Sequence, residues 1–165
     1  MTGDTDVLIQ YLDMQRSHVV GILEGASDDD LRRPLLPSGW SCLGMVKHLA
    51  LDVEHYWLQC IVDGASLDFF SQPALENNGA WRVAPDETSK DLFALYRDEC
   101  ARSNEIIRST PLEAPPKQRD KWWGEWKVPD LRFIVLHMIA ETACHAGHLD
   151  AARELIDGRQ WVVLN

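Results

Sequence analysis

The sequence of 165 residues is poor in basic side chains and has no apolar run long enough to cross a bilayer. Lysine and arginine total 16 against 26 aspartates and glutamates, which gives a net charge of −10. A field of this sign repels phosphate groups, so we expect neither nucleic acid nor an anionic membrane as a partner. A membrane-spanning helix needs roughly 20 apolar residues. The acidic segment 1–6 also lacks the basic-then-apolar profile of a secretion signal. We therefore expect a cytoplasmic protein.

Cysteine is scarce, and no pair of cysteines has the C-x-x-C spacing. The four cysteines lie at positions 42, 60, 100 and 144, each inside a helix-like stretch. This distribution argues against a disulfide framework and against a zinc ribbon or knuckle. We interpret the cysteines as small buried apolar residues, although Cys144 lies among the candidate site residues described below.

Strand-like alternation, internal repeats and low-complexity tracts are also lacking, except for a weak alternation at residues 161–164. Four long helical patterns are present instead, at about residues 6–25, 41–64, 89–110 and 129–157. A short helical piece at residues 27–32 follows the first pattern. Two long loops, at 66–85 and 111–128, carry most of the tryptophans. With 45% hydrophobic residues the chain can build a core. We predict a single domain over residues 1–165, all-α, with the architecture of a four-helix bundle with long crossover loops.

Periodicity assigns faces to the first and last of these helices. In the first helix the three- and four-residue steps select Val7, Tyr11, Met14, His18 and Ile22 as one stripe. In the last helix the polar face carries Arg132, Arg153 and Glu154. A second stripe of that helix, flanked by apolar residues, is formed by His137, Glu141, His145 and His148.

Ionisable groups beside a core are costly unless they are paired or bind a metal. Two ligands four residues apart on one helix, Glu141 and His145, converge on a single cation, and His48 of the second helix is the best outside ligand. Two histidines and one carboxylate leave coordination positions open, which suits catalysis. Alternatively, Glu141 and His145 form an internal salt bridge. His137 or His148 is a possible fourth ligand, whereas His18 and His55 are interpreted as non-catalytic.

Two segments resemble motifs of a known group, the DinB-like superfamily. Residues 136–148, with the sequence LHMIAETACHAGH, resemble the signature of its last helix. The stretch Ser38-Gly39-Trp40-Ser41, followed by Lys47-His48-Leu49 and Tyr56-Trp57, resembles the entry to its second helix. The resemblance covers nearly the whole chain in helix order. The superfamily includes DNA-damage-inducible proteins of unknown role, bacillithiol and mycothiol S-transferases, and mycothiol-dependent maleylpyruvate isomerase.

This resemblance implies a four-helix bundle with a divalent metal near one end, bound here by His48, Glu141 and His145. Most members have histidine at both positions of the last-helix pair, and Glu141 departs from that pattern. The set of one glutamate and two histidines is similar to the zinc site of the isomerase. We expect zinc, with nickel, manganese or iron as alternatives, because a carboxylate shifts preference toward harder ions. Many relatives have glutamine where this chain has His148.

The implied function is that of a metal-dependent S-transferase or isomerase that joins a low-molecular-weight thiol of the mycothiol or bacillithiol type to small electrophiles, in detoxification or stress response. His148 or Asp52 is expected to handle protons, and Trp40, Trp81 and Trp123 to bind substrate. A metal-dependent hydrolase is one alternative. A non-catalytic metal-binding stress-response protein is another. The buried helix faces of so small a chain leave room for a homodimer.

Overall fold

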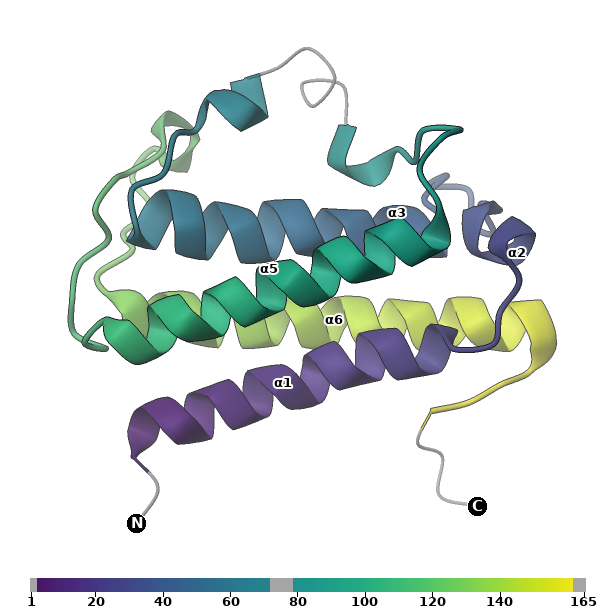
Figure 1. Ribbon diagram of the computed structural model, residues 1–165, viewed down its shortest axis with the longest axis horizontal. Coiled ribbons are helices and arrows are strands. Elements are labelled where there is room, and N and C mark those ends of the chain that lie inside the picture. Colours follow the sequence, from purple (N-terminus) through teal and green to yellow (C-terminus); the bar gives the residue numbers. More distant parts are fainter. Residues whose placement is uncertain (1–2, 72–78, 162–165) are drawn as a thin grey trace.

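The computed structural model describes residues 3–71 and 79–161, and every regular element in these ranges is helical (Figure 1). Four long rods form a bundle, and one of them is made of two elements joined end to end. This confirms the predicted all-α four-helix bundle with long crossover loops. The elements are α1 (Asp4–Leu23), α2 (Asp28–Arg32), α3 (Cys42–His48) continued by η1 (Leu49–Val62), η2 (Asp68–Ser71), η3 (Gly79–Trp81), α5 (Ser89–Ser109), η4 (Lys121–Trp123) and α6 (Leu131–Asp157).

The long helices pack in pairs: α1 lies along α6 and α5 lies along η1, while α6 and η1 also touch. Both crossover loops run over the side of the bundle that α3 and η1 form (Figure 1). The short helices η2, η3 and η4 belong to these loops. Loop side chains therefore gather against the most buried helix of the bundle.

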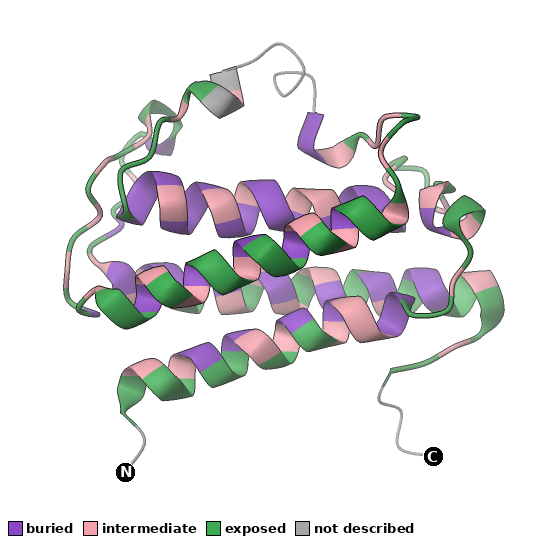
Figure 2. Cartoon of the chain, viewed as in Figure 1, coloured by how far each residue is buried: buried purple, intermediate pink, exposed green. Residues whose placement is uncertain are grey.

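The rod formed by α3 and η1 is buried almost all round (Figure 2). It begins at Ser41, whose hydroxyl accepts a hydrogen bond from the Gly44 amide at 3.1 Å, as expected of an N-cap. The winding is α-helical up to His48 and π-helical from Leu49 onward. π-helical segments are rare in proteins, and those that occur are often found at functional sites. The apolar spacing of the sequence did not predict this winding. The less buried positions of the rod after Val46 are polar: residues 47, 48, 52, 55 and 59.

The apolar stripe that periodicity selects in α1 is not the core face in its first half. Val7, Tyr11 and Met14 are exposed, with 39%, 55% and 55% of their surface accessible. The core face instead carries Ile9, Leu12, Arg16, Val19, Ile22 and Leu23. Apolar residues occur at helical spacing on both sides of this helix, and the true core face includes a charged residue. Arg16 is buried because its guanidinium pairs with the carboxylate of Glu54, which periodicity cannot reveal.

The last helix, α6, begins slightly later than predicted and ends where predicted. Asp130 is the N-cap, and its carboxylate accepts a hydrogen bond from the Phe133 amide at 2.9 Å. Pro129 therefore precedes the cap instead of occupying the first helical turn. Gly158 follows the helix with φ +78°, a left-handed conformation that glycine adopts without strain.

Arg153 is buried, with 3% exposure, although its position in the pattern places it on the polar face. Its guanidinium forms an ion pair with Asp157 at 2.8 Å. It also donates hydrogen bonds at 3.0 Å to the carbonyl oxygens of Ile22 and Glu24, at the end of α1. Carbonyls at a helix C-terminus lack partners within the helix, so Arg153 satisfies them and ties α1 to α6.

The described cysteines are all free, and Cys144 is exposed. The weak strand pattern at residues 161–164 falls outside the described residues except for Trp161, which stacks on the His18 ring at 5.1 Å. Among the described residues, every helix is too short or too polar to cross a bilayer.

Candidate metal centre

The structure brings the three predicted ligands together. One ligand atom from each of His48, Glu141 and His145 lies within 4.8 Å of the other two. His48 is the last residue of α3, whereas Glu141 and His145 are one turn apart on α6. The two imidazole rings meet edge to face, with 5.1 Å between their centroids. This group could hold a metal ion, with ligands drawn from two helices.

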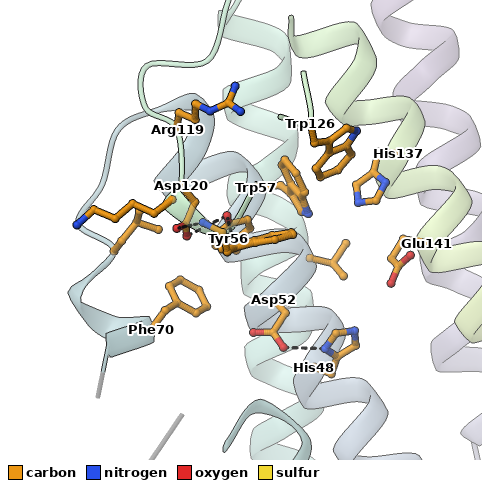
Figure 3. A pocket seen from close by; sticks show the side chains of 14 residues that line it. His48, Asp52, Tyr56, Trp57, Phe70, Arg119, Asp120, Trp126, His137 and Glu141 are labelled. Atoms are coloured by element: carbon orange, nitrogen blue, oxygen red, sulfur yellow. Dashed lines mark hydrogen bonds and ion pairs between the residues drawn. The ribbon is translucent and has the colours of Figure 1, made fainter. Parts of the chain in front are cut away.

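His48 is held in place from two sides. Its Nδ1 lies 2.8 Å from a carboxylate oxygen of Asp52, one turn further along the rod (Figure 3). Its ring stacks on the indole of Trp81, with centroids 4.0 Å apart. The other nitrogen, Nε2, is buried and has no hydrogen-bond partner within the described ranges. A buried polar atom without a partner is costly, and a cation bound at this group would give Nε2 a partner.

Gly44 allows Trp81 to reach His48. A Cβ atom on Gly44 would lie 2.3 Å from the backbone oxygen of Trp81, closer than real Cβ contacts. Only glycine therefore lets η3 pack directly on α3 at this point. Because Gly44 is one turn before His48, this close approach places the indole of Trp81 on the imidazole.

Glu141 and His145 contact each other as well. Nε2 of His145 lies 3.1 Å from Oε1 of Glu141. This hydrogen bond lowers the pKa of Glu141, so the carboxylate is ionised at neutral pH. The contact has the form of the internal salt bridge considered from sequence, and the same two atoms can converge on a cation. His148 is exposed, and its Nδ1 is 3.5 Å from Nδ1 of His145.

A cavity of about 880 Å³ opens from this group (Figure 3). His48, Asp52 and Glu141 contribute to its lining. The remaining lining residues are Val53, Tyr56, Trp57, Leu67, Phe70, Arg119, Asp120, Lys121, Trp122, Trp126 and His137. Most of these are aromatic or apolar, and the cavity is large enough for a small organic molecule.

His137, considered from sequence as a fourth ligand, belongs to this cavity and not to the ligand group. Its ring packs edge-on against Trp57 at 4.9 Å and Trp126 at 5.5 Å. Burial among these rings lowers the pKa of His137, so its imidazole is neutral at physiological pH.

The three predicted substrate-binding tryptophans lie in two places, and none of them lines the large cavity. Trp123 is buried and stacks on Trp57 at 5.4 Å, and it is not among the lining residues of the cavity. Its neighbours Trp122 and Trp126 do line the cavity. Trp40 and Trp81 line a separate hollow of about 400 Å³ together with Ser38, Gly39 and Arg82.

Arg119 and Lys121 were not expected at the site. The signal available in the sequence is the run of residues 119–123, RDKWW, where two basic residues alternate with an acid before two tryptophans. The two histidines interpreted as non-catalytic pair with carboxylates outside the site. His18 pairs with Asp150 at 2.7 Å, and His55 contacts Glu99 at 3.2 Å.

Comparison with known proteins matches the chain to a family. The family model described as Mycothiol-S-transferase matches residues 7–158. No curated protein matches the chain.

Proposed function

The chain belongs to the mycothiol S-transferase family, and we propose that it is a metal-dependent enzyme that transfers a small thiol to electrophilic molecules. Membership confirms the resemblance to the DinB-like superfamily that the motifs suggested. The family match supports the thiol as a substrate. The metal dependence is our proposal, and it is supported mainly by the buried, unpartnered Nε2 of His48 beside Glu141 and His145.

The donor set fits a divalent cation. Two imidazoles and one carboxylate are ligands that zinc accepts, and we propose zinc at this site. Asp52 accepts a hydrogen bond from the N–H at Nδ1 of His48, which leaves the Nε2 lone pair for the cation. Three protein ligands leave a coordination position open for a substrate, in contrast to the closed set of four that structural sites use.

The chemistry follows from that open position. A bound divalent cation would lower the pKa of a coordinated thiol into the neutral range. In the transfer, the thiol sulfur forms a bond to an electrophilic carbon, and a leaving group departs from that carbon with the bonding electrons. The thiol proton must leave as well. We propose that His148, exposed next to His145, takes it up at Nε2 and releases it to water.

The chain's own side chains set the geometry of this step. Asp52 and Trp81 fix the ring of His48, so the ligand needs little reorganisation. The aromatic walls of the cavity exclude water from the electrophile. Neutral His137, between Trp57 and Trp126, adds no charge that an apolar substrate would have to desolvate.

Metal analysis and thiol-transfer assays on the same preparations test this proposal. Protein purified without chelator should contain about one zinc per chain by elemental analysis. It should couple mycothiol to a fluorogenic haloalkyl electrophile. His48→Ala, Glu141→Gln and His145→Ala should lose both metal and activity and keep their helical circular dichroism.

His18→Gln is the matched control, because this histidine pairs with Asp150 outside the site. It should retain the metal and the activity. Full metal content in all three ligand variants would refute the metal centre. Activity that is unchanged after metal removal would refute its role in transfer.

A further inference from the structure

The two ends of the aromatic cavity are lined by different kinds of charged residue. At one end are the proposed metal ligands His48 and Glu141, and at the other are the charged residues of the loop before η4 (Figure 3). Four aromatic rings form the wall between them: Tyr56, Trp57, Trp122 and Trp126. The Trp57 ring meets Tyr56 at 85° and Trp126 at 87°, whereas the Trp122 ring is tilted by 34° from Tyr56 and by 41° from Trp126. Ring edges and faces are therefore both available to a flat ligand.

The polar groups of this wall are already used. The Tyr56 hydroxyl donates to Asp120 at 3.1 Å. It accepts hydrogen bonds from the indole nitrogens of Trp122 at 2.9 Å and Trp123 at 3.0 Å. The carboxylate of Asp120 also accepts from the Trp122 amide. A ligand rich in hydroxyl groups would therefore find few partners at this hydroxyl and carboxylate, whereas an aromatic ring needs none.

The outer end of the cavity carries two cations, Arg119 and Lys121. Neither Arg119 nor Lys121 forms an ion pair within residues 3–71 and 79–161, although the chain has a net charge of −10. The Arg119 guanidinium lies over the Trp123 ring at 5.7 Å and donates to the Gly124 carbonyl, which leaves other N–H groups available. Both side chains are exposed and line the cavity.

From these features we infer that the cavity is the electrophile subsite and that it selects flat aromatic electrophiles carrying a carboxylate. The ring lies between the aromatic walls, the carboxylate reaches Arg119 and Lys121, and the reacting carbon points toward His48 and Glu141. An acidic group on the reacting side would instead meet Asp52 and Glu141. The inference rests on the proposed thiol transfer, since only a second substrate needs a subsite beside the metal.

A pair of isosteric probes tests the preference without any turnover. Naphthalene-2-carboxylate and naphthalene-2-carboxamide have the same ring and nearly the same shape, but only the first is charged. Binding is measured by quenching of tryptophan fluorescence, confirmed by calorimetry, on zinc-loaded and metal-free protein. We expect the carboxylate to bind roughly tenfold more tightly than the amide, as for a charge-assisted contact at a partly exposed site.

Variants locate the source of the preference. Lys121→Gln should reduce the carboxylate-to-amide ratio several-fold, and Arg119→Gln combined with it should bring the ratio close to one. Lys127→Gln is the matched control, because this lysine is exposed on the same loop but does not line the cavity. It should leave the ratio unchanged. Amide binding should persist in every variant and report that the cavity is intact.

Three results would overturn the inference. Equal affinity of the two probes would remove the charge preference. A ratio unchanged in the double variant would place the carboxylate elsewhere. Carboxylate binding that disappears with the metal, but not with the two cations, would mean that the carboxylate binds the metal. Because no thiol is present, these outcomes are independent of whether mycothiol is transferred.

Discussion

Asp52 is the side chain that most directly tests the metal centre, because it holds a ligand without being a member of the ligand group. Removing it in Asp52→Ala takes away the acceptor that lies 2.8 Å from Nδ1 of His48. The imidazole can then adopt the other tautomer or rotate, and both changes weaken its Nε2 as a ligand. Partners of this kind typically change metal affinity by about 10–100-fold, or roughly 1.4–2.7 kcal/mol.

Competition with a chromophoric chelator measures this effect. Wild-type protein and two variants are titrated with zinc at one pH and one salt concentration. We expect affinity to decrease in the order wild type, Asp52→Asn, Asp52→Ala. Asparagine keeps an oxygen acceptor and loses the charge, so it should fall between the other two.

A matched control separates the hydrogen bond from net charge. Asp63→Asn removes a carboxylate just beyond the same rod, where it pairs with Lys117 and is 59% exposed. This variant should bind zinc as tightly as wild type. Equal affinity in Asp52→Ala and wild type, or an equal loss in Asp63→Asn, would refute the positioning role of Asp52.

Further predictions concern stability. Gly44→Ala places a methyl group 2.3 Å from a backbone oxygen of η3. We expect it to lower the free energy of unfolding by about 1–3 kcal/mol in urea titrations. Gly147→Ala, with nothing within 4 Å, should raise that free energy, and equal effects of the two would contradict the close approach. Hydrogen bonds to Cys60 and Glu99 raise the pKa of His55 from 6.5 to about 9. The stability from protonated His55 is therefore full below about pH 6.5 and lost as pH rises through about 9, so denaturation curves across this range should show a decline that His55→Gln abolishes. Glu54→Gln removes the buried carboxylate that pairs with Arg16 of α1 and leaves only the more exposed Asp13, and we expect a loss of about 3–5 kcal/mol, measured by urea unfolding. A loss below about 1 kcal/mol would contradict this view of the pair.

The proximity of the three proposed ligands was predictable in part, because helical spacing alone brings Glu141 and His145 together. His48 could be chosen with the help of the motif around it. The hydrogen bond that orients it was not predicted, although Asp52 was recognised as a candidate, because the one-turn spacing of the two residues does not specify which ring nitrogen is bonded.

The cavity was harder to predict than the ligands. Its walls come from η1 and from two loops far apart in sequence, and no periodic pattern relates them. Trp122, Trp123 and Trp126 are close in sequence, yet the turn at η4 sends Trp123 into the core and the other two into the cavity. Such choices depend on the long-range contacts of the Tyr56 hydroxyl, which local sequence does not reveal.

The buried charges explain the errors in helix faces. Arg16 and Arg153 occupy core positions because each finds a carboxylate on a helix, and Arg153 also finds carbonyls of α1. Because arginine is rarely buried, residue type alone predicted that both side chains lie at the protein surface. Only the packed bundle supplies the partners that make their burial possible.

The ion pair at the end of α6 makes the far end of the chain responsible for anchoring its first helix. Trimming the protein after Ile156, by a protease or by genetic truncation, would remove the carboxylate of Asp157 and leave the guanidinium of Arg153 to hold the α1 carbonyls unaided. Amide hydrogen exchange would then become faster in residues 4–23, although none of those residues had been altered.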